Sequence, residues 1–399
     1  MKSAFAVTYK IEDPVLAAQE LTSKIKSKLQ LARNSCCILF AEIPFELDEL
    51  LPELEKNLNL PVIGLTSASQ ISGEGYHRLS ATLMVLTADD CNFSMALSNY
   101  LPKNSSQSAW EAEIADTYNR ASTGLCGEEP ELILLFSGFE KGILDDDLIS
   151  EVNRLSNGKP IFGGVCSDYN TLKDGKVFLG TKARSDGIAM LLISGNIKPK
   201  FTIGMIAPNL IPKAKITATN VNEVLSIDNQ SPCEYLKKNG VDVDSPYSFF
   251  FHPLVLNFKI NKQSIGQPVT KIITSLNKQT GSAICKTNIP QGANLAVCNV
   301  SGKDIEESTR ESFLYMQQEY LSASNDSYKY STMLGISCVA RHIVLAYNYE
   351  QEGRLACELL PEGLNFMGCY SFGEYAPVPV ENSPDANLSH NISIALCMF

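Results

Sequence analysis

The stretches LILLF at 132–136, PIFGGVCSD at 160–168 and IAMLL at 188–192, with a helical segment between the first two, decide the fold of this chain. This order predicts a buried strand, an amphipathic helix, a glycine-bearing strand and a return strand. The order occurs twice more, in CCILF at 36–40, PVIGLTSAS at 61–69 and TLMVL at 82–86, and in ISCVA at 336–340, NFMGCYSFGE at 365–374 and ISIAL at 392–396. The gap from the first strand to the glycine stays between 24 and 28 residues. Such spacing indicates an internal repeat.

Apolar residues at helical spacing place helices between these strands. Four sets show this spacing: Leu47 to Leu58, in which Pro52 is expected to kink the helix or to start its regular part; Leu144 to Leu155; Trp110 to Ala121; and Ile305 to Tyr320. Asp145–Asp147 favour a helix N-terminus through the helix dipole. The last two helices follow the apolar stretches NFSMAL at 92–97 and NLAVCN at 294–299, which we expect to be strands that lead into their units.

Strands joined by helices of this length imply parallel crossovers, whereas the return strands are free to run antiparallel. The prediction is an α/β protein with two related domains of mixed β-sheet and packed helices, built from repeated strand-helix-strand units. We place the domains at 31–215 and 216–399, because the chain passes through Pro199, Pro208 and Pro212 between them. An N-terminal helical segment, 1–30, precedes them, with Asp13 as N-cap and Pro14 at the first helical position.

Composition limits the classes of partner. The chain has 399 residues, 44% of them apolar, and a net charge of −11, which argues against nucleic acid because phosphate affinity rests on Lys and Arg. No apolar run approaches the length of a membrane span or of a signal-peptide core. We therefore expect a cytoplasmic protein, with twelve cysteines that are mostly buried thiols.

Common catalytic motifs are missing from the sequence. It contains no phosphate loop, no dinucleotide fingerprint, no nucleophile elbow and no paired histidines at zinc spacing. Cys166 and Ser167 follow a strand, where a nucleophile can occur, and Asp168 follows them. The alternative is that small residues open the carboxyl ends of the strands into a ligand pocket. We predict no enzyme activity and no metal centre.

The last third of the chain carries a family pattern. GISCVARHIVL, GCYSFGEYAP and LSHNISIALCMF resemble the C-terminal half of FIST domains, with its Cys-x-x-Arg, Gly-x-Tyr-x-x-Gly-Glu-x-x-Pro and His-Asn motifs. PVIGLTSAS, PELILLFSG and PIFGGVCSD resemble the N-terminal half. The resemblance covers nearly the whole chain after about residue 30 and departs from the pattern at His252, where a plain aromatic residue is expected.

The resemblance implies a bacterial, intracellular sensory module that binds a small molecule such as an amino acid. It implies signalling through a separate partner, such as a histidine kinase or a cyclic-diguanylate enzyme. Two alternatives stay open. One is a haem-binding nitric oxide sensor, with His390 or His252 as the axial ligand, and the other is a protein-binding scaffold.

The expected ligand site lies in the C-terminal domain. It consists of five residues that match the family motifs, together with Ser371, which follows Tyr370: Arg341, Tyr370, Ser371, Glu374, His390 and Asn391. We expect Arg341 to end the strand ISCVA, so that its guanidinium group emerges at the carboxyl edge of the sheet and binds a carboxylate or a phosphate. In the structural alternative, Arg341 and Glu374 form an ion pair with each other.

Overall fold

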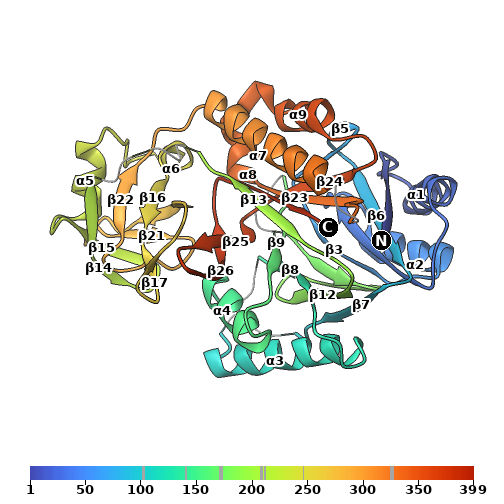
Figure 1. Ribbon diagram of the computed structural model, residues 1–399. Helices are drawn as coiled ribbons and strands as arrows, with labels where there is room; N and C mark the ends of the chain where they lie inside the picture. Colours follow the sequence, from blue (N-terminus) through green and yellow to red (C-terminus); the bar gives the residue numbers. More distant parts are fainter. Residues whose placement is uncertain are drawn as a thin grey trace.

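The structure is a computed structural model that describes residues 1–100, 104–139, 142–169, 174–206, 210, 213–245, 247–323 and 328–399. It confirms an α/β fold with mixed sheets and packed helices, shown in Figure 1. Of the prolines near the expected boundary, Pro208 and Pro212 lie outside these residues. The boundary at 216 falls within strand β14 (Ala214–Asn220). Along the described ranges, no helix is both long and apolar enough to cross a membrane.

Three units follow one order of elements. The first contains β1 (Lys2–Thr8), α1 (Pro14–Lys28), β2 (Asn34–Ala41), α2 (Leu47–Leu58), β3 (Val62–Thr66), β4 (Gln70–Ser72), β5 (Gly75–His77) and β6 (Ala81–Ala88). The second contains β7 (Cys91–Leu97), α3 (Gln107–Thr123), β8 (Leu132–Ser137), α4 (Asp145–Leu155), β9 (Ile161–Val165), β10 (Val177–Leu179), β11 (Lys182–Arg184) and β12 (Ile188–Gly195). The third contains β13 (Lys200–Gly204), α7 (Gly302–Ala323), β23 (Thr332–Cys338), α8 (Val339–Leu345), η1 (Ala346–Asn348), α9 (Gln351–Leu359), β24 (Asn365–Ser371), β25 (Glu374–Val380), β26 (Ser383–His390) and β27 (Ile394–Met398).

The predicted strand directions are confirmed in every unit. The crossover strands are parallel in β2–β3, β8–β9 and β23–β24. The return strands β6, β12 and β27 are antiparallel to the first crossover strand of their unit, which is β2, β8 or β23. Gly64, Gly163 and Gly368 occupy matching places, and a Cβ atom on each would lie 1.8, 2.0 and 2.8 Å from the carbonyl oxygen of the paired strand. The glycines thus allow the parallel strands to approach closely.

Each unit completes its neighbour's sheet. The hairpin β10–β11 of the second unit pairs with β3 of the first, and β25–β26 of the third pairs with β9 of the second. The hairpin β4–β5 of the first unit pairs with β24 of the third. The strand orders are β1-β6-β2-β3-β10-β11, β7-β12-β8-β9-β25-β26 and β13-β27-β23-β24-β4-β5. The three units therefore exchange hairpins in a closed ring.

The sheets share one core and carry helices on their outer faces (Figure 1). Phe40, Phe162 and Ile336, one from each unit, belong to the shared core. Two helices cover the outer face of each sheet: α1 and α2 cover the sheet of the first unit, α3 and α4 that of the second, and α7 and α9 that of the third. Cys36 lies in the shared core and Cys37 under the helices, because neighbouring strand residues face opposite sides. Nine cysteines are buried, in accord with the prediction.

The N-terminal segment contains the predicted helix and also a strand. Asp13 caps α1 by accepting a hydrogen bond from Leu16 N at 2.9 Å. Leu21 and Ile25 pack toward the sheet of the first unit. The apolar residues before the helix form β1, which pairs with β6. Residues 1–30 are therefore an integral part of the first unit.

A further body is inserted between β13 and α7 of the third unit. It contains β14 (Ala214–Asn220), β15 (Glu223–Ile227), α5 (Pro232–Lys238), α6 (Ser248–Phe251), β16 (Leu254–Asn257), β17 (Lys259–Ile260), β18 (Gln263–Ser264), β19 (Val269–Lys271), β20 (Ile273–Leu276), β21 (Ala283–Cys285) and β22 (Asn294–Val297). It has its own core. The stretch NLAVCN forms β22 in this body, so its expected place as the leading strand of the third unit is wrong, and β13 takes that place.

Three consecutive aspartates at the start of α4 hold this inserted body. Asp145 binds Lys286 Nζ at 2.9 Å, and Asp146 binds Lys271 Nζ at 3.3 Å. Asn288 donates its backbone N–H to Asp146 at 2.8 Å and its side-chain amide to Asp147 at 2.9 Å. The aspartates lie in the first helical turn, as predicted.

Candidate functional site

The ends of β3, β9 and β24 meet where the three units join. Ser167 N donates to Thr66 O at 2.9 Å, Tyr370 N donates to Ser69 O at 3.0 Å, and Phe372 N donates to Val165 O at 3.1 Å. The Ser167 hydroxyl donates to Tyr370 O at 2.6 Å and accepts from Ala68 N at 3.0 Å. Ser167 is fully buried, as is its neighbour Cys166. Ser167 thus joins the backbones of the other two units.

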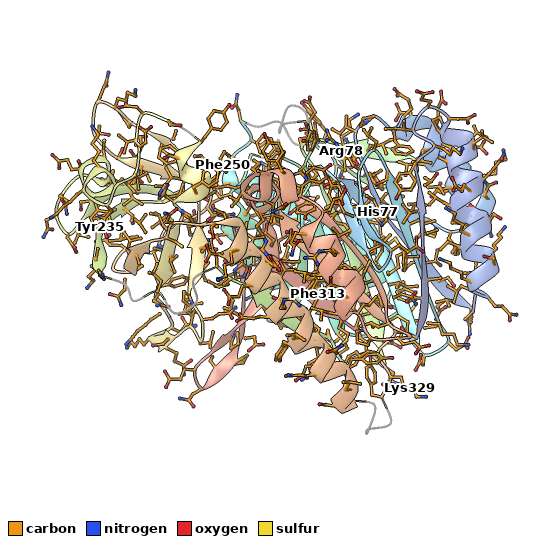
Figure 2. All side chains as sticks on the ribbon, turned by 90° about the horizontal axis from the view of Figure 1, so that it is seen from above. His77, Arg78, Tyr235, Phe250, Phe313 and Lys329 are labelled. Atoms are coloured by element: carbon orange, nitrogen blue, oxygen red, sulfur yellow. The ribbon has the colours of Figure 1, made fainter. Side chains whose placement is uncertain are left out.

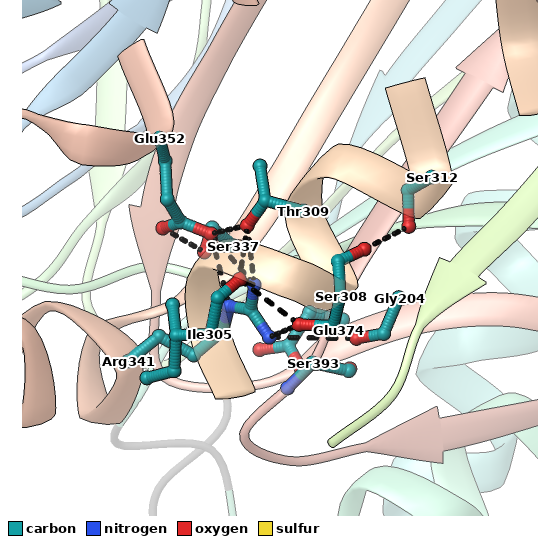
Figure 3. Close-up of polar contacts among 10 residues, drawn as sticks. All are labelled: Gly204, Ile305, Ser308, Thr309, Ser312, Ser337, Arg341, Glu352, Glu374 and Ser393. Carbon is teal, nitrogen blue, oxygen red and sulfur yellow. Dashed lines mark hydrogen bonds and ion pairs between the residues drawn. The ribbon is translucent and has the colours of Figure 1, made fainter. Parts of the chain in front are cut away.

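Arg341 lies in helix α8, and the expectation that it ends a strand is wrong. The chain leaves the sheet at Cys338, and the apolar run continues as a helix. A short apolar run does not distinguish a strand from a buried helix. The guanidinium group is fully buried and turns inward (Figure 3).

The partner of Arg341 is Glu352 of α9, so the structural alternative, an ion pair of Arg341 with Glu374, is wrong in its partner. Glu352 Oε1 accepts from Arg341 Nε at 3.0 Å and from Nη2 at 2.8 Å, and both side chains have no exposed surface. Further acceptors on α7 and β13 are Ser308 Oγ, Thr309 Oγ1, Ile305 O and Gly204 O, at 2.7 to 3.4 Å. Figure 3 shows how these groups surround the guanidinium plane. The network joins α7, α8 and α9.

Glu352 remains charged inside this network. Burial raises its pKa, but Arg341, Tyr370 and Ser337 more than offset this, so the pKa is lowered. The Ser337 hydroxyl donates to Oε2 at 2.9 Å. The hydroxyl group of Tyr370 lies beside Glu352 outside ordinary hydrogen-bond geometry, and burial followed by the charge of Glu352 raises its pKa well above the usual value.

Glu374 and Ser371 lie at the junction between the second and third units. Glu374 Oε2 accepts from Ser393 Oγ at 2.6 Å, while Oε1 lacks a hydrogen-bond partner among the described residues. Burial raises the pKa of Glu374 to about 8, although Ser393 and Lys286 act in the opposite direction. The Ser371 hydroxyl donates to Gly373 O at 2.9 Å and fixes the turn before β25.

His390 and Asn391 are also interior residues. His390 Nε2 lies 3.1 Å from Ala376 O, and burial lowers its pKa to about 3. Asn391 Oδ1 accepts from Ile272 N at 3.2 Å, which ties the residue after β26 to the inserted body. A haem group at His390 would have to open the pairing of β25 with β26. His252 is half-buried, and its Nδ1 lies 2.8 Å from Ser248 O.

The six predicted residues therefore form interior networks and do not line an open pocket together. Arg341 and Tyr370 share Glu352, whereas Glu374, His390 and Asn391 lie toward the second unit and the inserted body. Tyr370 is also fully buried, and its ring contacts the ring of His342 at a centroid distance of 5.0 Å.

A cluster of rings surrounds His342, in the middle of α8. Tyr76, from the hairpin that the first unit provides, and Tyr349 lie 5.7 Å from the His342 ring, and Tyr76 and Tyr349 lie 5.2 Å from each other. The Tyr76 hydroxyl is 2.9 Å from His342 Nε2. Burial lowers the pKa of His342 to about 4, so the ring is neutral at pH 7. The guanidinium group of Arg78 stacks on Tyr169, 3.8 Å from the ring centroid.

A surface cleft of about 580 Å³ borders this cluster. Its walls contain rings, carboxylates and one guanidinium group, from Glu74, Tyr76, Tyr347, Tyr349, Glu350, Gln351 and Arg354. Gln351 Nε2 is buried without a hydrogen-bond partner among the described residues. Figure 2 shows Arg78 and Phe250 toward the same side of the molecule, with Phe313 of α7 nearer the middle and Tyr235 at the far end of the inserted body.

This cleft was not predicted from the sequence. Tyr76 lies in a three-residue strand, and the segment after α8 carries no catalytic or phosphate-binding motif. The sequence feature that could have indicated the cleft is the pair Tyr347 and Tyr349, two aromatic residues in the polar segment AYNYE.

Fold and site define an α/β protein of three interlocked units with a buried polar centre and an aromatic cleft beside it. The FIST N domain model matches residues 35–230 and the FIST C domain model matches residues 232–377, so the chain belongs to the FIST family. This confirms the resemblance found in the sequence. FIST domains are sensory domains of signal transduction, a non-catalytic family.

Other comparisons add little. None of the curated proteins matches the chain. Among solved structures, "T. maritima PurL complexed with ATP" is similar over 99% of this chain and 71% of its own, with 8% identity and a TM-score of 0.21. A likeness at this level carries no argument about fold or function.

Proposed function

We propose that this chain is an intracellular sensor that binds a free amino acid in the cleft beside Tyr76 and Tyr349. The observation that carries the proposal is the combination of charges around an aromatic wall. Arg354 is placed to bind a carboxylate, and Glu74 or Glu350 to bind an ammonium group. The rings offer an apolar surface to a side chain. A zwitterion matches this arrangement better than a simple anion or cation.

The buried networks connect this cleft to the rest of the molecule. Glu352 lies in the same helix as Arg354 and holds Arg341. Tyr370 contacts both the ring cluster and Glu352. We propose that Arg341 and Tyr370 support the site from below and that Ser371, Glu374, His390 and Asn391 stabilise the junction. The signal then passes to a separate protein, such as a histidine kinase or a cyclic-diguanylate enzyme.

Thermal-shift measurements with each of the common amino acids test the proposal, because a ligand that binds the native state raises its stability. We expect at least one amino acid to raise the melting temperature. Arg354→Ala should weaken its binding at least tenfold. Arg310→Ala is the matched control, since Arg310 also contacts Glu306 and Glu358 but does not line the cleft. The proposal fails if no amino acid shifts the melting temperature, or if both variants bind equally well.

The haem alternative retains His252 as its candidate ligand. Expression with added haem followed by absorption spectroscopy tests it: a Soret band that His252→Ala removes would favour gas sensing over amino-acid binding.

A further inference from the structure

A second cleft lies on another side of the molecule, between α4, the inserted body and the hairpin β25–β26. Its volume is about 490 Å³. In Figure 1, β26 runs between the inserted body and α4. None of its lining residues belongs to the amino-acid cleft proposed above.

One wall of this cleft is the free edge of a sheet. β26 is the outermost strand of its sheet, and the six consecutive residues Ser383–Leu388 all line the cleft. Side chains alternate between the two faces of a strand, so a cleft on one face would contact every second residue. Contact with six in a row indicates that the cleft follows the strand edge and meets its backbone.

The backbone N–H and C=O groups along this edge are able to form further hydrogen bonds. Within the described part of the chain, Ser383–Leu388 make backbone hydrogen bonds only in their pairing with β25. Ser383, Pro384 and Asp385 are exposed, and Ala386 and Leu388 are partly exposed. Pro384 has no N–H group, which limits further pairing to the residues after it.

The other walls suit an extended chain. Asp146, Ser150 and Asn153 follow one face of α4 at helical spacing. Phe258 and Ile260 of the inserted body and Val380 of β25 add apolar surface. A strand laid along β26 would place alternate side chains against this apolar surface and the remaining ones toward solvent.

The charges along the cleft favour one kind of added peptide strand. Asp146 is neutralised by Lys271, whose side chain is only 3% exposed. Asp385 is the exposed charge of the lining, and the whole chain carries a net charge of −11. A basic side chain opposite Asp385 is therefore favoured, and an acidic segment is repelled.

We propose that the edge of β26 is a docking site for an extended peptide segment of a partner protein. The segment adds to the sheet as a further strand, alternates apolar and polar residues, and carries Lys or Arg near Asp385. The site goes beyond amino-acid sensing, since it offers a separate surface through which a partner contacts both the second unit and the inserted body.

Selection from a random octapeptide display library against the full chain tests the proposal. We expect enriched peptides with this alternation and a basic residue. Ser150→Trp, which fills the cleft from an exposed position of α4, should weaken their binding at least tenfold. Arg154→Trp places the same bulk on the same helix outside the lining and should change nothing. Asp385→Trp is a second blocking variant, should Ser150→Trp fail to fold.

Two further measurements define the binding mode. Each selected peptide is synthesised in two forms, one methylated at the odd-numbered and one at the even-numbered backbone nitrogens. One form should lose binding and the other should keep it, because strand addition needs the N–H groups on only one edge of the peptide. Asp385→Lys should weaken basic peptides at least fivefold.

The proposal is overturned by any of three results. The first is a selection that yields no peptides, or peptides that bind the blocked variants equally. The second is full binding by both methylated forms. The third is a dimer that Ser150→Trp dissociates, which would assign the edge to a second copy of the chain. The thermal shifts with amino acids do not depend on this edge, so the two proposals fail separately.

Discussion

At the residue scale, the buried pair of Arg341 and Glu352 shows how an interior network resembles a binding site in sequence. An arginine after an apolar run is a plausible ligand contact, yet every donor direction of this guanidinium group faces a protein acceptor. The acceptors come from positions 11 to 137 residues away along the chain. A local sequence pattern therefore does not show which acceptors surround this arginine.

Arg341→Met should lower the free energy of unfolding by about 3–5 kcal/mol, because Glu352 would keep a buried charge without its partner. Replacing both residues, by Met and Leu, should recover part of this loss. Urea denaturation of the single and double variants measures both effects. The surface variant Arg354→Met is the control, with a change of about 0.5 kcal/mol or less. Equal unfolding midpoints for wild type and Arg341→Met would contradict the prediction.

The buried carboxyl group of Glu374 should make the stability of the protein depend on pH. Burial raises its folded-state pKa to about 8, whereas the unfolded value is ordinary. Between these values the folded state holds a proton that the unfolded state lacks, so the contribution of Glu374 to stability falls as the pH rises toward 8.

The variant Glu374→Gln cannot lose this proton. Its melting temperature relative to wild type should therefore rise between pH 5 and pH 8. Taking the difference at each pH cancels the titration of Glu42, whose pKa burial raises to about 7, because Glu42 titrates in both proteins. A difference that stays constant, or falls, across this range would refute the assignment.

At the scale of elements, much of the fold could be predicted from the sequence. The apolar stretches of five residues, the leucine stripes and the recurring glycine are local patterns, and together they predict the parallel crossovers. The hairpins β4–β5 and β10–β11 could not be predicted, because their strands have three residues each, too few to show a pattern of alternation. Their partners lie in other units, and α8 continues the apolar run of β23 without a break.

The glycine of the parallel strand offers a direct test of strand packing. Gly163→Ala would place a Cβ atom 2.0 Å from Leu135 O. The backbone φ of +152° is also one that residues with a side chain rarely adopt, so the backbone cannot easily shift to remove the clash. We expect a large fall in melting temperature or a failure to fold. Gly302→Ala is the control, since its Cβ atom would find its nearest neighbour at 3.9 Å, within helix α7. Normal stability of Gly163→Ala would show that the strands separate more easily than their geometry implies.

At the scale of the whole molecule, the ring of exchanged hairpins makes the units depend on one another. Each six-stranded sheet obtains two strands from a different unit, and the inner faces share one apolar core. The inserted body differs, because its sheets are built from its own strands around a separate core, although the backbone of 264–266 also hydrogen-bonds with the end of β25. The family match divides the chain near residue 231, whereas the strand exchange crosses that division in both directions.

Residues 1–198 alone should therefore fail to form a compact native state. This fragment lacks β25 and β26, which complete the sheet of the second unit, and its hairpin β4–β5 lacks the sheet of the third. The exposed strand edges should make it aggregate or bind a hydrophobic dye. Co-expression with residues 199–399 should restore a complex that elutes like the intact chain, because both sets of edges are then paired. Size-exclusion chromatography and circular dichroism of the fragment, alone and with its complement, make the comparison. A monomeric fragment with a sharp thermal transition of its own would show that the first two units fold without the hairpin of the third, and that the exchange is an addition to their stability rather than a condition of it.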